Sequence, residues 1–195
     1  MERGRGDDVR DFLVQTRKLA YDEVEKTGMP VKFHVDLARE VGKKLAKKLR
    51  ANVNIVEAGT LLMDCLIGQA IRAGKLEEHI AMSLAKANKI LDQSIVSNEV
   101  KENIRHCISE HHGTQKFYSL ESEICCNADC YRFVSIKGFS YAMRYIRSMP
   151  FSDLVTLLDK KVTEKWGLLS LSICKKELAN QHEIIEKILR GLKAP

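Results

Sequence analysis

The sequence has little proline, no long apolar run and no apolar segment at its start. Only 3 prolines and 11 glycines occur among 195 residues, and they form no linker, so we expect a single domain over residues 1–195. A helix that spans a bilayer needs about 20 apolar residues, and no run here approaches that length. The opening residues, MERGRGDD, lack the apolar stretch of a signal peptide. We therefore expect a cytoplasmic protein with no membrane association.

The six cysteines lack the C-x-x-C spacing that is typical of zinc knuckles. Cys125, Cys126 and Cys130 lie close together in the sequence, which leaves two interpretations open, a zinc site or ordinary packing. Packing is the commoner role, because free cysteine behaves as a small hydrophobic residue. For a chain of this length without a secretory signal, reduced thiols are favoured over a disulfide framework.

Basic residues outnumber acidic ones, and the formal net charge is +6. Much of the excess comes from the segment GKKLAKKLR at 42–50. A surface that binds single-stranded nucleic acid usually interleaves aromatic and basic side chains, and this segment has no aromatic residue. We favour a solvated helix face, with nucleic-acid binding as the alternative.

Apolar residues recur at helical spacing along nearly the whole sequence, and no sustained period-2 alternation indicates strands. The fold class that this predicts is an all-α bundle. A loop is expected at 113–119, and leucine and isoleucine on the last two helices could form core or a homodimer face. The predicted helices cover 8–26, 31–50, 54–67, 76–91, 97–111, 119–133, 139–147, 152–169 and 173–192.

Several ionisable side chains fall on the apolar faces of these helices. Each has an ordinary explanation by itself; Asp129, for example, could pair with Arg132 or Arg144. A buried carboxylate needs partners, however, and imidazoles and carboxylates that converge in a bundle core are ligands for divalent metal ions. The inward-facing residues come from five helices, and they are His34, Asp64, His79, His111, His112 and Asp129.

In this order, the residues resemble the HD-domain superfamily of metal-dependent phosphohydrolases. The resemblance covers about residues 30–147, with C-terminal helices following at about 150–192, and it implies an HD-domain-like helical bundle. The family has a His-Asp doublet where this chain has Met63 and Asp64. The segments that carry the resemblance are FHVDLAREVGKKLA, EAGTLLMDCLIG, EEHIAMSLAKANKIL, IRHCISEHHG and ESEICCNADCYRF.

The resemblance implies one or two divalent metal ions (Mn, Fe, Zn, Mg or Co). In binuclear members one ion takes the first histidine, the doublet and the last aspartate, which leaves this chain His34, Asp64 and Asp129 for it. The second ion would use Asp64 with His79, His111 and His112. Because a methionine thioether is a poor substitute for imidazole on hard divalent ions, we expect weaker binding at the first position.

The function implied is hydrolysis of a small phosphorylated substrate, which could be a nucleotide, through a metal-activated water that the catalytic Asp64 orients. Cations that flank the expected site could bind the phosphate or lie on the surface. The alternative is a catalytically impaired HD domain that binds a nucleotide or a protein partner in a regulatory role. A cation paired with Asp64 would favour that alternative. The candidate phosphate ligands are Arg72, Lys75, Lys116 and Arg144.

Overall fold

The computed structural model describes residues 5–144 and 149–193, and all regular structure in these ranges is helical. The predicted all-α fold is thus confirmed. The elements in chain order are α1 (Arg5–Thr27), α2 (Lys32–Leu49), α3 (Val53–Leu62), α4 (Ile67–Arg72), the 3-10 turn η1 (Leu76–Glu78), α5 (His79–Gln93), α6 (Asn98–Ser109), α7 (Leu120–Val134), α8 (Ile136–Ala142), α9 (Phe151–Leu168) and α10 (Ser172–Lys193).

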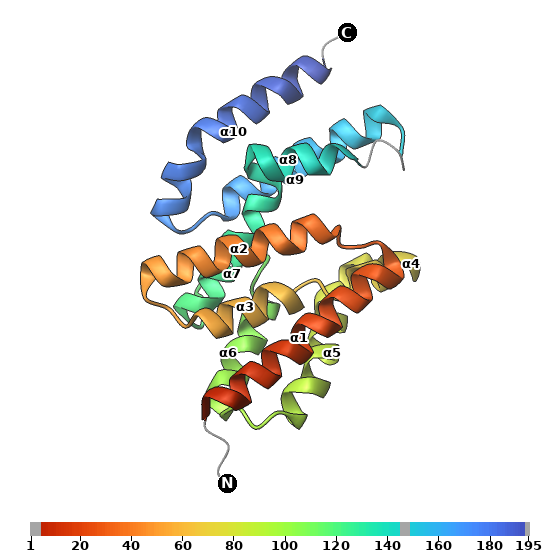
Figure 1. Ribbon diagram of the computed structural model, residues 1–195. Coiled ribbons are helices and arrows are strands. Elements are labelled where there is room, and N and C mark those ends of the chain that lie inside the picture. The colour runs from red at the N-terminus through yellow and green to blue at the C-terminus, as the bar shows by residue number, and fades with distance from the viewer. Residues whose placement is uncertain (1–4, 145–148, 194–195) are drawn as a thin grey trace.

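Helix α7 lies at the centre of the bundle and contacts α2, α3 and α6 on one side and α8, α9 and α10 on the other (Figure 1). Nearly all of its side chains are buried, as the largely apolar segment ICCNADCYRFV predicts. Helices α8, α9 and α10 enclose a core cluster of their own at the upper end of Figure 1. Polar side chains of α7 therefore lie inside the protein and need partners there.

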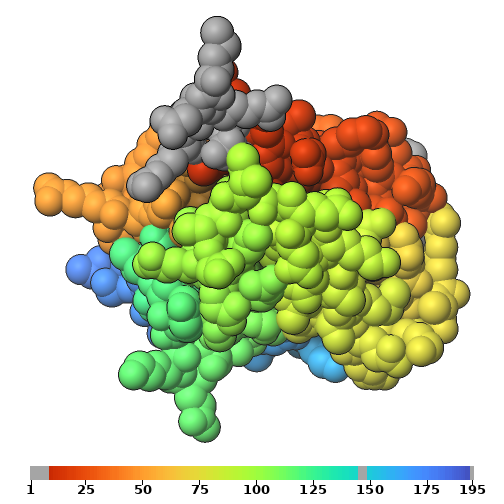
Figure 2. All heavy atoms as spheres, turned by 90° about the horizontal axis from the view of Figure 1, so that it is seen from below, coloured from red at the N-terminus to blue at the C-terminus, as the bar shows by residue number. Residues whose placement is uncertain are grey.

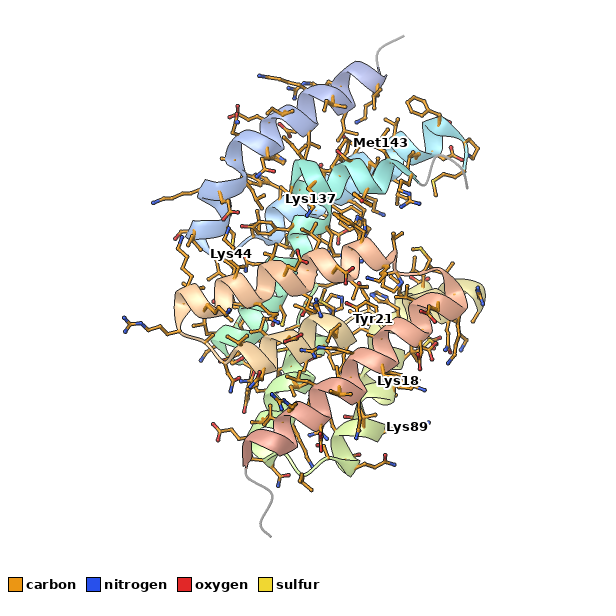
Figure 3. The ribbon with its side chains drawn as sticks, in the orientation of Figure 1. Lys18, Tyr21, Lys44, Lys89, Lys137 and Met143 are labelled. Atoms are coloured by element: carbon orange, nitrogen blue, oxygen red, sulfur yellow. The ribbon has the colours of Figure 1, made fainter. Side chains whose placement is uncertain are left out.

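Helices α5 and α6 form much of the opposite end of the molecule, next to α1 (Figure 2). The basic face of α2 lies elsewhere and exposes Lys44, Lys47 and Lys48 to solvent, as predicted. Lys44, labelled in Figure 3, lies between α2 and α10, where its ammonium is 3.8 Å from Glu177. A shallow hollow of about 570 Å³ follows this basic face.

The predicted helix 54–67 is interrupted, and this part of the prediction was wrong. Helix α3 ends at Leu62, residues 63–66 form a turn, and α4 begins at Ile67. The backbone N–H of Leu66 leaves the helical pattern and donates to Ser83 Oγ at 3.1 Å. This partner lies 17 residues away in the sequence, and residues 63–66 contain no glycine or proline that would signal the break. The turn carries Asp64.

The other boundaries agree with the prediction to within a few residues. Ser119 caps α7, because its Oγ accepts from the Ser122 N–H at 3.0 Å. Helix α8 begins three residues before the predicted start, since Ser135 Oγ accepts from the Gly138 N–H at 3.0 Å and caps the helix earlier. Helix α8 ends at Ala142, before the predicted end at Arg147, and residues 145–147 lie outside the described residues.

Among the residues that the structure describes, one segment, Val53–Arg72, is long and apolar enough to cross a membrane by length and composition alone. It consists of α3, the turn and α4, and 78% of it is buried inside the protein. Burial of this extent is typical of core helices. The six cysteines are also buried, and all are free, which confirms the predicted reduced thiols.

Candidate metal centre

Four of the six predicted ligands come together in the structure. Asp64, His79, His111 and His112 each offer one ligand atom, and these atoms all lie within 4.8 Å of one another. Asp64 comes from the turn after α3, His79 is the first residue of α5, and the other two follow α6. The first three are buried and His112 is partly buried. We call these four residues the histidine cluster.

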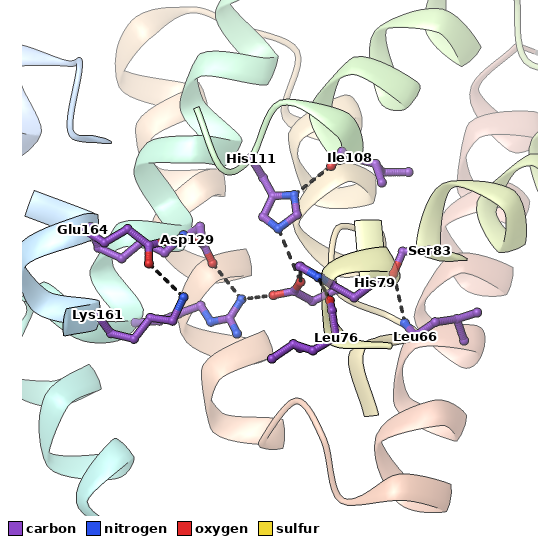
Figure 4. Close-up of polar contacts among 12 residues, drawn as sticks. Leu66, Leu76, His79, Ser83, Ile108, His111, Asp129, Lys161 and Glu164 are labelled. Atoms are coloured by element: carbon purple, nitrogen blue, oxygen red, sulfur yellow. Dashed lines mark hydrogen bonds and ion pairs between the residues drawn. The ribbon is translucent and has the colours of Figure 1, made fainter. Parts of the chain in front are cut away.

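Two backbone carbonyls fix the orientation of the histidine rings (Figure 4). His79 Nδ1 lies 2.6 Å from the carbonyl oxygen of Leu76, and His111 Nδ1 lies 2.7 Å from that of Ile108. A carbonyl only accepts, so each Nδ1 carries the proton and donates. In a neutral ring Nε2 is then left with a lone pair, which is the state a metal ligand requires.

Both Nε2 atoms point at the same carboxylate oxygen. His79 Nε2 lies 3.4 Å and His111 Nε2 3.3 Å from Asp64 Oδ1, and none of these three buried atoms has a hydrogen-bond partner. Lone pairs that face a carboxylate oxygen repel it unless a proton or a metal ion lies between them. The orphaned atoms, with their rings fixed by backbone carbonyls, fit a divalent cation.

The charges around the histidine cluster keep Asp64 ionised. Burial would raise the pKa of its carboxyl, but the nearby guanidinium of Arg132 and the imidazole of His111 outweigh this and hold the pKa well below its usual range. His112 stays neutral because burial and the neighbouring His111 lower its pKa to about 3. The cluster thus offers an anionic oxygen beside three imidazoles, of which that of His112 is neutral.

A chain of buried ion pairs lies on the other side of Asp64. Arg132 Nη1 is 2.5 Å from Asp64 Oδ2 and 2.7 Å from Asp129 Oδ1, which confirms the predicted pairing of Asp129 with Arg132. Lys165 Nζ, from α9, is 2.7 Å from Asp129 Oδ2. Burial would raise the pKa of Asp129, but Lys165 and Arg132 outweigh it and lower that pKa. We call Asp64, Arg132, Asp129 and Lys165 the ion-pair chain.

The structure does not bring His34 and Asp129 into the histidine cluster. His34 is buried as predicted, but its Nε2 lies 3.2 Å from the carbonyl oxygen of Gly138 and donates to it. Burial and the charge of Arg132 lower the pKa of His34 to about 4, so the ring is neutral. Met63 is 1% exposed and packs in the core. The metal-ligand roles of the six residues stay predictions.

The predicted phosphate ligands are exposed, and three of the four have other contacts. Arg72 donates to the backbone oxygen of Lys26 at 3.0 Å, and Lys75 pairs with Glu78 at 3.3 Å. Arg144 lies over the ring of Tyr141, and Lys116 is exposed in the loop before α7. Their role in substrate binding stays a prediction.

Sequence reasoning missed the cations of α9. Lys165 is 2% exposed. Burial would lower the pKa of His79, but Asp64 outweighs it and raises that pKa, and Lys161, one turn before Lys165, lies near enough for its charge to oppose the rise. Helix α9 lies beyond the segments that carry the family resemblance, and its lysines look like surface residues. The available signal was periodicity, because Lys165 falls on the stripe of Leu158, Val162 and Leu169.

Comparison with solved structures shows the same fold elsewhere. YpgQ of Bacillus subtilis superposes with a TM-score of 0.67 at 14% identity, over 95% of each chain. The YpgQ complex with ADP superposes with a TM-score of 0.66 at 16% identity, over 96% of this chain and 94% of the YpgQ chain. A predicted HD superfamily hydrolase from an uncultured Thermotogales bacterium superposes with a TM-score of 0.58 at 13% identity, over 79% of this chain and 84% of the hydrolase chain.

No family model matches the chain, and no curated protein matches it. The likeness to the solved structures confirms the resemblance to the HD superfamily at the level of the fold.

Proposed function

We propose that the chain is a metal-dependent phosphohydrolase whose divalent ion binds at the histidine cluster. The observation that carries the proposal is the convergence of His79 Nε2 and His111 Nε2 on Asp64 Oδ1 with no hydrogen-bond partner between them. The ligand mixture of imidazole and carboxylate suits Mn, Fe, Zn or Co. The substrate is a small phosphate ester or anhydride, and a nucleotide is supported by the ADP complex of YpgQ.

A bound divalent ion would supply Lewis acidity towards a phosphoryl oxygen and towards an attacking water. Side chains of the protein would orient the water and neutralise the charge of the substrate phosphate. Asp64 Oδ1 would hold the ion together with the two imidazoles, and the Asp64 carboxylate would orient the attacking water. Lys161 is 30% exposed and near enough to His79 for its charge to act on that ring, so its ammonium is the candidate to neutralise a substrate phosphate. During hydrolysis the oxygen of water bonds to phosphorus as the bond to the leaving group breaks.

The test is release of phosphate from ADP with Mn²⁺ by the wild type and by Asp64→Asn. We expect release by the wild type, its loss on chelation, and a reduction of at least about 100-fold in the variant, because an amide oxygen is neither an anionic ligand nor a base. Asp92→Asn is the matched control: Asp92 is 67% exposed and pairs with Arg105 at 2.9 Å. Equal rates for wild type and Asp64→Asn would refute the proposal.

A second function is favoured by one observation, the contact of Arg132 with Asp64 Oδ2 at 2.5 Å. A cation on the central carboxylate is what a catalytically impaired, regulatory HD domain would show. Under that proposal ADP binds with no phosphate release under any metal condition. Calorimetric titration with ADP, run beside the phosphate assay, separates the two functions.

A further inference from the structure

The carboxylate of Asp64 is divided between two environments. Its Oδ1 faces the imidazoles of His79 and His111, and its Oδ2 contacts the guanidinium of Arg132. A carboxylate with one oxygen on each of two cations is the usual bridge of a binuclear metal site. In this chain one of the two cations is a side chain of the protein.

The surroundings of Arg132 correspond to the position where the family resemblance implies the other ion. That ion would use His34, Asp64, Asp129 and a histidine at position 63. Here a single nitrogen, Arg132 Nη1, contacts Asp64 Oδ2 at 2.5 Å and Asp129 Oδ1 at 2.7 Å. Met63 offers no imidazole, and the Nε2 proton of His34 is donated to a backbone carbonyl.

We propose that the guanidinium of Arg132 permanently occupies the place of one metal ion, so the site binds a single divalent ion at the histidine cluster. This deepens the proposed function, on which it rests for the identity of the remaining site. Arg132 is a positioning residue: it fixes the carboxylate plane of Asp64 through Oδ2 and leaves Oδ1 to the imidazoles. Its positive charge also repels a second cation from between the two carboxylates.

Lys165 completes this arrangement from α9. Its ammonium lies 2.7 Å from Asp129 Oδ2, while Arg132 Nη1 contacts Asp129 Oδ1 at 2.7 Å. Both oxygens of Asp129 are therefore held by fixed positive charges, and the two buried carboxylates are balanced by two buried cations. A second divalent ion would have to displace Arg132 from both carboxylates, which would leave the guanidinium buried without its partners.

The experiment is a titration with Mn²⁺ alone, followed by elemental analysis of the desalted protein. We expect one equivalent in the wild type. The variant Met63→His with Arg132→Ala restores the ligand and removes the guanidinium, so it should bind two. Arg105→Ala is the matched control, because Arg105 also bridges two acids, Asp92 at 2.9 Å and Glu102 at 3.2 Å, and it should bind one.

Asp129→Asn covers the case in which the double variant does not fold. Since Asp129 is outside the histidine cluster, this variant should keep its one equivalent, whereas His111→Ala should lose it. Two equivalents or none in the wild type, one in a folded double variant, or loss of the ion in Asp129→Asn would overturn the inference. A wild type that binds one equivalent and releases no phosphate would support the inference and refute only the hydrolase.

Discussion

Replacing Lys165 by methionine should destabilise the fold much more than the same replacement at Lys161, one turn earlier on α9. The side chain of Lys165 is 2% exposed, and its Nζ lies 2.7 Å from Asp129 Oδ2. Lys161 is 30% exposed and pairs with Glu164 at 2.9 Å. The two substitutions remove the same charge from the same helix, so they differ in burial and in the partner left behind.

The magnitude follows from that difference. Removing one partner of a buried ion pair costs about 3–5 kcal/mol, because the other charge stays buried without compensation. Arg132 still holds Asp129 Oδ1 at 2.7 Å, so we expect the lower end for Lys165→Met, about 3 kcal/mol. A partly exposed pair such as that of Lys161 contributes about 0–1 kcal/mol.

The assay is urea unfolding at pH 7 with a chelator, followed by circular dichroism. A double-mutant cycle with Asp129→Asn isolates the pair: the double variant should lose less stability than the sum of the single ones, by more than about 1 kcal/mol. If Lys165→Met and Lys161→Met lose the same unfolding free energy, or if the effects of Lys165 and Asp129 simply add, the ion-pair chain does not stabilise the core as argued.

Two further predictions concern packing and pH. Gly59→Ala should cost about 1–3 kcal/mol in urea unfolding, since its new Cβ would lie 2.5 Å from Cys107 Cβ and 2.7 Å from Cys125 Sγ. Gly167→Ala, with no atom within 4 Å, should be neutral or stabilise by up to about 1 kcal/mol, and equal losses for both would refute the packing argument. For pH, the unfolded chain protonates His34 near 6.5 whereas the folded protein does so at about 4. The contribution of His34 to the stability of the metal-free protein, fully present above pH 6.5, should therefore fall by up to about 3 kcal/mol as the pH drops to 4. His112, whose pKa is also lowered, adds a loss in the same direction, and a flat urea midpoint over this range would contradict the prediction.

The sequence predicted the helices because their apolar spacing and serine caps are local signals. The break after Leu62 was not predictable in this way, since it depends on the hydrogen bond from Leu66 to Ser83, 17 residues away. A continuous helix was the better local interpretation. The consequence is functional, because the turn, and not a helix face, presents Asp64 to the histidines.

For the site, the order and spacing of the inward-facing residues predicted which histidines lie near Asp64, because the family resemblance assigns each histidine to a helix of the bundle. The buried cations of the ion-pair chain were harder to predict from the sequence. A buried lysine on a charged amphipathic helix differs from an exposed one only through its tertiary partner. The sequence left the partner of Asp129 open between Arg132 and Arg144, and the structure pairs it with Arg132. That Arg132 also reaches Asp64, 68 residues away, needed the packing of α7 beside α3.

The position of Asp129 and Arg132 on one helix has a consequence for the order in which the protein assembles. The two residues are three apart on α7, so their pairing needs only a formed helix and no contact with another element. A newly formed α7 carries its acid already neutralised, and the helix can dock into the core without first capturing a cation from solution. Neutralisation of Asp129 during folding then needs no metal ion, which would bind only once the histidine cluster has formed.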